Sequence, residues 1–556
     1  MIQTIKQMIN EAINKNHYQL NQVIKLEKNK KIAFGDFSTN VAMIIAQSTK
    51  EDVEQIAATL IKDLSKHQIF SKITFAQPGF INFTLNLDHL VHFAKTVQIQ
   101  KDHFGFQPKK ALAYLVELIS ANPTGLLHVG HARNGIYSDV LVRLLRVNGH
   151  VVLTEYLIND SGNQIKNLIK SVYYRYLQLL NQKVSLDENS YHGAEIIECA
   201  QAFYQQYQNQ YLNQQPELLE DFAINFFMDQ IKRDLAQCNI AIETYFSEKK
   251  MDQNHEIKAV FQQFQNDIYQ KDQATWFASS KYLGISKDEV LIKSDQTITY
   301  YAKDLAYHLN KLNRIKKISP KYQLINVWGA DHHGHVLRIR AFLKAINEDQ
   351  NVIFLITQLV RLIKDNQEVK MSKRSGKSLL LKDIFSLLGQ AELRWFLVSQ
   401  SINSHIDINL NIVGQKSSNN PVYYVLYAYA RIWQIIHKVP NYQFEPEKFN
   451  LLTTTIEREM INQLYCYETT IIQAGQTFEP YHICNYLYDL AKLLHSFYNQ
   501  NPILNLNDLQ LKKQRLDLIY LVQQIIHNGL NILGIQHYDR MDFLEKQFDQ
   551  ENKKLV

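Results

Sequence analysis

The spacing of apolar and polar positions divides the 556-residue chain into three segments, of which the first is residues 1–108. This segment opens with apolar residues at helical spacing. It ends with ITFAQPGFINFTL (73–85), whose alternation predicts two strands joined by a Pro-Gly turn. The combination indicates a small α+β module, and the stretch FGFQPKK (104–110) is expected to connect it to the next domain.

The second segment, residues 109–395, alternates between buried strands and helices. ALAYLVELI (111–119) is a nearly continuous apolar run, which is typical of a central parallel strand. The stretch KYQLINVWGADHHGH (321–335) repeats the order of a strand and a polar loop. Such units predict a doubly wound α/β domain, and the region from about 170 to 270, rich in Gln and Tyr, is expected to be a mostly helical insertion.

The third segment, residues 396–556, shows helical periodicity almost throughout. Between Leu516 and Leu533 one face stays apolar, and Gly534 then provides a helix stop signal. The chain holds 18 glycines and 10 prolines, well below the average frequency of these residues, which favours long helices and short connections. A C-terminal helical bundle is therefore expected.

Composition and charge limit the class of protein. Hydrophobic residues make up 46% of the chain and charged residues 21%, which excludes intrinsic disorder, a collagen-like fibre and a disulfide scaffold. The 4 cysteines form no C-x-x-C pair, which suits a reducing compartment and excludes a zinc site built from cysteines. No apolar run is long enough for a signal peptide or a membrane span, so a cytoplasmic protein is expected. The net charge of +6 is compatible with a polyanionic partner without requiring one.

The first candidate for chemistry is His128-Val129-Gly130-His131, at an expected strand-to-helix turn. A nucleotide site uses backbone donors at a helix N-terminus for phosphate, and a glycine where the nucleotide approaches the main chain. Two imidazoles one helical turn apart can donate hydrogen bonds to phosphate oxygens as charge grows in the transition state. The alternative interpretation is a solvated helix start or half of a metal site.

The second candidate is Lys370-Met371-Ser372-Lys373, in a polar loop of the same predicted domain. Two lysines there can neutralise a departing pyrophosphate. On its own the motif is better explained as an exposed basic turn. After the histidine motif and on the same α/β domain, it predicts nucleotide activation.

Together these motifs resemble the signatures of the class I aminoacyl-tRNA synthetases, and along nearly its whole length the chain resembles the arginyl-tRNA synthetases. The segments that carry the resemblance are GDFSTN (35–40), PGFINF (78–83), VELISANPTGLLHVGH (116–131), YLINDSGNQ (156–164), YYAKDLAYH (300–308), WGADHHGH (328–335), VKMSKRSGK (369–377), NPVYYVLYAYARI (420–432) and YLYDLAKLLHSFYN (486–499). The resemblance implies a tRNA-binding α+β module at 1–108, a Rossmann-type catalytic domain at 109–395 and a helical anticodon-binding domain at 396–556.

The resemblance also implies the reaction and the partners. Arginine and ATP would give arginyl-adenylate and pyrophosphate, and the arginyl group would then pass to the 2′-hydroxyl of the 3′-terminal adenosine of tRNA(Arg). Members of the family usually need bound tRNA before the first step proceeds. A monomer is expected, as is usual in the family.

Arginine carries a planar guanidinium with five donors, so its pocket needs acceptors. The resemblance assigns Glu117, Tyr300 and Asp304 to the guanidinium, and Asn122 and His128 to the α-amino and α-carboxylate groups. The alternatives are that Glu117 is a buried salt-bridge partner and Tyr300 a core aromatic. Two acidic groups around one guanidinium would explain the rejection of lysine, so discrimination by binding alone is expected, without a separate editing domain.

The ATP site is expected to use residues from both signatures and from the loop after the strand at 321–329. The expected ATP-binding residues are Pro123, Thr124, Gly125, His128, Gly130, His131, Gly329, Asp331, His332, Lys370 and Lys373, with His128, Gly130, His131, Lys370, Met371, Ser372 and Lys373 as the catalytic group. The stretch Asp331-His332-His333-Gly334-His335 also suits metal ligation, but its place at a strand end favours the nucleotide pocket. No protein-held metal is expected, and Mg²⁺ would accompany ATP through the phosphates.

Contacts with tRNA are expected in two places. Phe80 and Asn82 lie two residues apart on a predicted strand and so share a face, and the resemblance places such a pair against a base of the D-loop. The alternative is that Phe80 packs in the core. In the helical segment Tyr423 and Tyr427 are expected to stack on anticodon bases, and the alternative is that they pack in the core at helical spacing.

A run of basic residues follows the Y-Y-A-K-D motif. It comprises Lys311, Arg314, Lys316, Lys317 and Lys321. These residues are expected to contact tRNA phosphates, and the alternative is an ordinary solvated helix face.

Two other functions remain open at this point. A different class I synthetase or a small nucleotidyltransferase would share both signatures, but Glu117, Tyr300 and Asp304 suit a guanidinium and would be out of place around an apolar side chain. A catalytically inactive tRNA-binding relative would have damaged signatures, whereas the histidines and lysines of both motifs are present.

Overall fold

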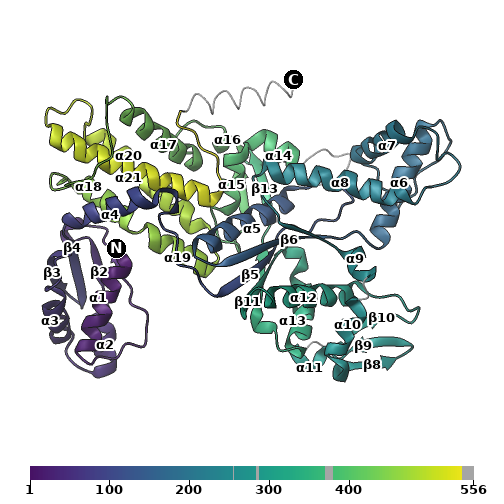
Figure 1. Ribbon diagram of the computed structural model, residues 1–556, viewed down its shortest axis with the longest axis horizontal. Coiled ribbons are helices and arrows are strands. Elements are labelled where there is room, and N and C mark those ends of the chain that lie inside the picture. Colours follow the sequence, from purple (N-terminus) through teal and green to yellow (C-terminus); the bar gives the residue numbers. More distant parts are fainter. Residues whose placement is uncertain (254–255, 284–286, 370–379, 541–556) are drawn as a thin grey trace. The chain divides into compact units, whose positions relative to one another are not determined.

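The computed structural model describes residues 1–253, 256–283, 287–369 and 380–540 (Figure 1). The chain forms two compact units: Met1–Gln107 with Gly414–Val556, and Pro108–Val413. The first segment and most of the third segment expected from the sequence therefore belong to one unit. The second unit extends beyond residue 395, because β15 (Ile406–Asn409) pairs in parallel with β13 (Val360–Lys364).

The N-terminal part of the first unit is an α+β module with an antiparallel sheet in the order β1-β2-β4-β3. The hairpin predicted from the sequence is formed by β3 and β4. Its turn holds Gly79 at φ 155, where a Cβ would lie 2.3 Å from Met43 Cγ, so the turn requires glycine. The elements are α1 (Ile2–Lys15), β1 (Glu27–Lys28), η1 (Ile32–Phe34), β2 (Phe37–Thr39), α2 (Val41–Thr49), α3 (Val53–Leu64), β3 (Phe70–Ala76), β4 (Phe80–Leu85), α4 (Asp88–Gln100) and η2 (Lys101–His103).

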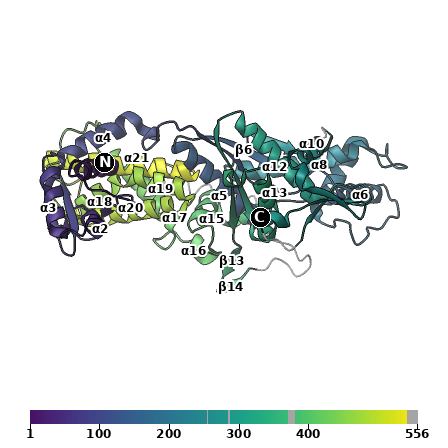
Figure 2. The same ribbon diagram turned by 90° about the horizontal axis from the view of Figure 1, so that it is seen from below.

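The C-terminal part of this unit is a helical bundle in which α17, α20 and α21 pack against one another (Figures 1 and 2). Thr454 and Glu457 form a reciprocal cap at the start of α18, and Gly534, at φ 66, ends α21 where the sequence predicts a stop. The helices are α17 (Pro421–Ile436), α18 (Thr455–Tyr465), α19 (Tyr467–Thr477), α20 (Tyr481–Gln500) and α21 (Leu509–Leu533).

A buried carboxylate ties the module to the bundle within this unit. Asp36, in the GDFSTN segment, is buried and accepts hydrogen bonds from Arg458 Nε at 2.8 Å and from Asn462 Nδ2 at 2.8 Å. Its other oxygen accepts from Arg458 Nη2 at 2.5 Å and from the backbone N–H of Leu85 at 2.7 Å. Both carboxylate oxygens are thus satisfied, so Asp36 can remain charged in the interior.

The second unit is built on a parallel five-stranded sheet in the order β12-β11-β5-β6-β7. The chain runs from β5 outward in one direction through β6 and β7, and then returns to add β11 and β12 on the other side. This is a doubly wound Rossmann-type sheet, and its topological switch point lies between β5 and β11, where Glu117 is paired with Asn326. The strands are β5 (Leu112–Glu117), β6 (Val151–Ile158), β7 (Thr244–Ser247), β11 (Lys321–Gly329) and β12 (Val352–Thr357).

Helices cover this sheet, and α12 packs against both β5 and β11. The helical and 3-10 elements are α5 (Val129–Val147), α6 (Asn163–Leu179), α7 (Ala194–Tyr207), α8 (Leu218–Gln237), α9 (Glu248–Gln253), α10 (Glu256–Gln263), η3 (Gln265–Asp267), α11 (Ser280–Leu283), α12 (Tyr300–Lys316), η4 (Ala330–His332), α13 (His333–Ala345), η5 (Asp349–Asn351), α14 (Leu381–Leu388), α15 (Gln390–Val398) and α16 (Leu410–Val413). The remaining strands are β8 (Ile268–Lys271), β9 (Ala274–Phe277), β10 (Glu289–Ile292) and β14 (Gln367–Glu368).

The region expected to be a helical insertion does hold α6, α7 and α8 (Figure 1). It also holds β7, an edge strand of the main sheet, which the sequence pattern did not reveal because the strand has only 4 residues. In the part of the chain that the structure describes, no helix is long and apolar enough to cross a membrane.

Candidate active site

The two histidines of the first signature cap the N-terminus of α5. His128 Nδ1 accepts a hydrogen bond from the Gly130 N–H at 3.1 Å, and His131 Nδ1 accepts from the His128 N–H at 3.3 Å. Their rings stack with centroids 3.7 Å apart. Burial lowers the pKa of His131 to about 3, with His128 adding to the effect. Burial also lowers the pKa of His128, against the opposing charge of Asp331.

These hydrogen bonds fix the tautomer of both rings. Because each Nδ1 accepts a backbone N–H and each ring is neutral, the proton of each imidazole lies on Nε2. The helix start therefore offers two Nε2–H donors at the positive end of the α5 dipole. This is the donor set that a phosphate needs.

Gly130 keeps the histidine pair in place. A Cβ at this position would lie 3.0 Å from His128 Cε1 and 3.2 Å from His128 Nδ1, so any side chain would press on the capping ring. In the preceding loop Pro123 is buried and Thr124 is partly exposed. Gly125 of the same loop borders open space, because a Cβ at this position would have no atom within 4 Å.

The loop after β11 forms the other side of the switch point. A Cβ on Gly329 would lie 2.6 Å from Asp331 Oδ1, at the end of an exposed side chain. The charge of Asp331 opposes the lowering of the His128 pKa. His332 is also exposed and lies beside Trp328, with ring centroids 5.7 Å apart. Among the described residues, no three His, Cys, Asp or Glu side chains are arranged to hold a metal ion.

Helix α12 contributes two of the three residues expected to bind the guanidinium. Tyr300 starts the helix and is 58% exposed, so it is not a core aromatic. Its hydroxyl lies over Gly162, where a Cβ would be 2.8 Å from Tyr300 Oη. One turn later, Asp304 Oδ2 lies 2.7 Å from His335 Nε2, and its side chain is one-third exposed. Asn122, from the first signature loop, donates to Gln164 Oε1 at 2.6 Å.

Glu117 has a different environment from Asp304. It is 2% exposed; its Oε2 lies 2.6 Å from Lys311 Nζ, and its Oε1 accepts from Ser120 Oγ at 2.8 Å. This is the buried salt bridge that the sequence left open as the alternative. The prediction that Lys311 contacts tRNA phosphate is wrong, because its side chain is completely buried.

The rest of the basic run is partly engaged as well. Arg314 pairs with Glu155 through two hydrogen bonds of 2.5 and 2.8 Å, and Lys316 lies 2.7 Å from Glu348. Periodicity could not distinguish these ion pairs from a solvated helix face, because the partner carboxylates are distant in sequence.

The second signature, Lys370 to Lys373, lies outside the described residues, which stop at Val369 and resume at Leu380. On the N-terminal side the Val369 N–H donates to the Leu362 carbonyl at 2.8 Å. On the C-terminal side Leu380 forms an antiparallel bridge with His128, and the Leu381 N–H donates to the Leu127 carbonyl at 2.7 Å. The chain that leaves the second signature therefore pairs directly with the first.

Comparison with known proteins agrees with this geometry. Residues 3–85 match the family description "Arginyl tRNA synthetase N terminal domain", residues 94–395 match "tRNA synthetases class I (R), catalytic domain", and residues 425–541 match "DALR anticodon binding domain". The chain belongs to the arginyl-tRNA synthetase family. The predicted family and the predicted fold class are confirmed.

Individual arginyl-tRNA synthetases are similar over nearly the full length. The arginine–tRNA ligase of Ureaplasma parvum serovar 3 is 41% identical over 555 residues, which cover 97% of this chain and 99% of the relative. That of Malacoplasma penetrans is 36% identical and covers 96% of this chain and 98% of the relative. A solved structure described as a putative arginyl-tRNA synthetase from Campylobacter jejuni has a TM-score of 0.75 at 29% identity, and covers 82% of this chain and 100% of that chain.

The N-terminal α+β module carries the first pair of residues expected to contact tRNA. Phe80 begins β4 and is 37% exposed, so it does not pack in the core. Asn82 lies two positions along the same strand but is only 6% exposed, between Thr74 and Ser38 of the neighbouring strands. The face that they share thus offers an aromatic ring at the surface and an amide at greater depth.

The second expected pair lies on α17 and extends into a third ring. Tyr423 and Tyr427 stack with centroids 6.2 Å apart and an interplanar angle of 10°. Tyr427 is exposed and stacks in turn on His495 of α20 at 5.5 Å. Sequence reasoning missed His495, although it lies within the YLYDLAKLLHSFYN segment. The exposed Arg431 follows Tyr427 by one helical turn.

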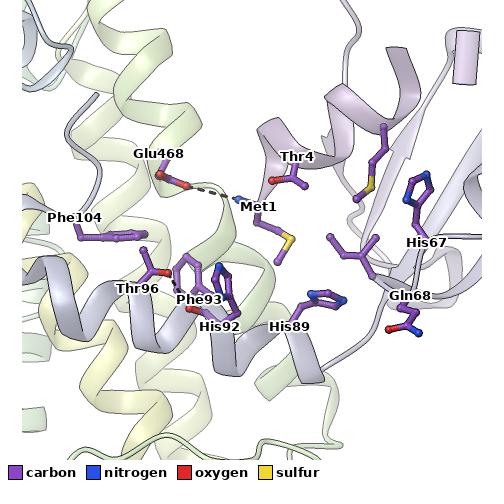
Figure 3. A pocket seen from close by; sticks show the side chains of 12 residues that line it. Met1, Thr4, His67, Gln68, His89, His92, Phe93, Thr96, Phe104 and Glu468 are labelled. Atoms are coloured by element: carbon purple, nitrogen blue, oxygen red, sulfur yellow. Dashed lines mark hydrogen bonds and ion pairs between the residues drawn. The ribbon is translucent and has the colours of Figure 1, made fainter. Parts of the chain in front are cut away.

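The first unit also contains a cavity of about 380 Å³ (Figure 3). Its lining includes His67, His89, His92, Phe93 and Glu468. No residue predicted to bind arginine, ATP or tRNA lines it, so it takes no part in the candidate site.

Proposed function

We propose that this chain activates arginine with ATP and transfers it to tRNA(Arg), using the switch point between β5 and β11 as the active site. The observation that carries the proposal is the neutral histidine pair at the start of α5, which adjoins the chain that follows the second signature. Its membership of the arginyl-tRNA synthetase family supports the same reaction.

In the first step the carboxylate oxygen of arginine attacks the α-phosphorus of ATP, and the bond to the β-phosphate oxygen breaks to release pyrophosphate. His128 and His131 donate from Nε2 to phosphate oxygens, and the N-terminus of α5 adds backbone donors. Lys370 and Lys373 are proposed to neutralise the pyrophosphate. Mg²⁺ is proposed to accompany ATP and would supply further charge neutralisation at the phosphates.

Arginine is proposed to lie with its guanidinium against Tyr300 and Asp304. Both side chains reach the surface from one face of α12, and the guanidinium can replace His335 as the partner of Asp304. Asn122 and His128 are proposed for the α-amino and α-carboxylate groups. Glu117, which is buried at the end of β5, is proposed to form the inner wall of the pocket.

In the second step the 2′-hydroxyl of the terminal adenosine attacks the carbonyl carbon of arginyl-adenylate, and AMP leaves. The tRNA is proposed to reach the first unit through Phe80 and Asn82 on the module, and through Tyr423 and Tyr427 on the bundle. A monomer that works in the cytoplasm is part of the proposal.

Arginine-dependent ATP–pyrophosphate exchange, with and without tRNA(Arg), tests the function, with the other nineteen amino acids as controls. Exchange with arginine alone, and only in the presence of tRNA, is the expected result. Exchange with a different amino acid would overturn the arginine pocket. If the folded protein bound tRNA but catalysed no exchange, the chain would be an inactive relative.

A further inference from the structure

Beneath the proposed arginine pocket lies a buried ammonium for which the reaction as described so far has no use. Lys311 has an exposed fraction of 0%, although a lysine is rarely fully buried unless it is paired. Its Nζ lies 2.6 Å from Glu117 Oε2, 2.6 Å from Asn326 Oδ1 and 4.1 Å from the centroid of the Tyr307 ring. Its three N–H donors are thus matched by a carboxylate, an amide oxygen and an aromatic face.

The two acceptors of Lys311 lie opposite each other across the switch point. Glu117 and Asn326 are register partners on the parallel strands β5 and β11. The loop after Glu117 leads to His128, and the chain after Asn326 leads to Asp331. One ammonium on α12 therefore binds both strand ends at the switch point, and one of its partners is Glu117 of the proposed arginine pocket.

From Asn326 the hydrogen bonds continue to Asp304 in one direction. Burial holds the pKa of His308 well below its ordinary value, so its ring is neutral. Its Nδ1 donates to the Asp304 carbonyl at 2.8 Å, which leaves its Nε2 to accept from Asn326 Nδ2 at 3.4 Å. That bond turns the amide oxygen of Asn326 toward Lys311. The tautomer of His308 and the orientation of the Asn326 amide are therefore both determined.

We propose that Lys311 is a positioning residue for arginine, which holds Glu117 and the Asp304 turn of α12 at a fixed separation around the guanidinium. This inference rests on the proposed function. Lys311 acts through Glu117 and touches neither substrate. Without the ammonium, Glu117 would be a buried carboxylate with no counter-charge, and it would have to move or take up a proton.

The test is a double-mutant cycle with Lys311→Met, Glu117→Gln and the variant that carries both, measured by arginine-dependent exchange in the presence of tRNA. Lys311→Met is expected to raise the KM for arginine roughly 10²-fold, as a misplaced binding group does, with the KM for ATP nearly unchanged. In the Glu117→Gln background the same substitution is expected to add less than about threefold, because its effect passes through the carboxylate. Lys311→Arg, which keeps the charge, should restore most of the arginine affinity.

Equal losses from Lys311→Met with and without Glu117 would overturn the positioning role, as would a parallel rise in the KM for ATP. The double variant buries no unpaired charge, so if Lys311→Met alone fails to fold, the step from Glu117→Gln to the double variant still tests the role, and a loss above about threefold in that step would overturn it. Exchange by the wild-type protein distinguishes a failure of the proposed function from a failure of the proposed role of Lys311. If the unmodified chain shows no arginine-dependent exchange, the proposed function fails. If the unmodified chain does show exchange and the losses from Lys311→Met and Glu117→Gln are additive, only the proposed role of Lys311 fails.

Discussion

The two sides of the switch point differ in how far their hydrogen bonds are satisfied within the protein. On the β5 side, Glu117 is held by Lys311 and Ser120, and His128 and His131 cap the helix that they begin. On the α12–α13 side, Tyr300 and the exposed residues Asp331 and His332 lie at the surface. The β5 side is therefore arranged before substrates bind, whereas the α12–α13 side offers groups that substrates can still engage.

This difference predicts two kinds of mutational effect. A substitution on the β5 side should act through geometry, because it breaks bonds that hold other groups in place. A substitution on the α12–α13 side should act through the loss of its own contact with the substrate. Matched substitutions on the two sides therefore test the comparison directly.

The largest effect is expected from the histidine pair. His131→Ala removes an Nε2–H donor and the bond that caps His128, so arginine-dependent ATP–pyrophosphate exchange should slow by about 10²- to 10³-fold. The matched control is His332→Ala, which removes an exposed imidazole from the other side and should cost roughly tenfold at most. Equal losses in the two variants would contradict a preformed β5 side.

The carboxylate on the α12–α13 side comes next. Asp304→Asn keeps the shape of the side chain but removes the charge, so kcat/KM for arginine should fall by about 10- to 10²-fold through one lost charged hydrogen bond. The KM for ATP should stay within about twofold. Asp331→Asn is the control on the same side, and it is expected to alter the KM for ATP instead of that for arginine. Reversed effects would exchange the two assignments.

The sequence predicted what local signals encode. The strand before His128, the helix after it and the glycine stop at Gly534 all follow from short-range patterns, and the structure has them in place. The surface positions of Phe80 and Tyr300 could be predicted from the sequence, because each residue belongs to a motif that indicates a binding site. Such signals need no knowledge of the partner across the fold.

The environment of Lys311 could not be predicted in this way. In sequence it belongs to a basic run that predicts either contacts with tRNA phosphates or a solvated face, and its partner Glu117 is 194 residues away. Only the parallel pairing of β5 with β11 brings Glu117 and Asn326 together beneath α12. The same holds for β7, a four-residue edge strand. Its pairing with β6 makes it part of the sheet, whereas its own short sequence does not predict a strand. Long-range pairing, not local propensity, decides these features.

The two glycines give a smaller and sharper test of the comparison. Gly130→Ala would place a Cβ 3.0 Å from a ring that is fixed by its capping bond, so exchange should slow roughly tenfold as His128 shifts. Gly329→Ala would meet only the end of the Asp331 side chain, which is exposed and can rotate away. Its effect should be about twofold or less. A larger loss in Gly329→Ala would mean that the α12–α13 side is the rigid one.

The smallest effect concerns stability and pH. In the folded protein the pKa of His131 is about 3, whereas an unfolded histidine titrates near 6.5, so the unfolded state takes up a proton first as the pH falls. The stability that His131 contributes is complete above pH 6.5 and is lost progressively between 6.5 and 3. Lowering the pH from 7.5 to 5.5 should therefore destabilise the wild type by about 1.4 kcal/mol more than His131→Asn, which has no imidazole to protonate.

Urea unfolding of both proteins at the two pH values measures this difference, with the signal taken from the unit that holds α5. His332→Asn is the matched control, because it replaces an imidazole by an amide at an exposed position. If His131→Asn also kept the pH dependence of the wild type, His131 would have to carry its proton in the folded protein. Its Nδ1 could then no longer accept the His128 N–H, and the β5 side would lose the fixed tautomers that distinguish it from the α12–α13 side.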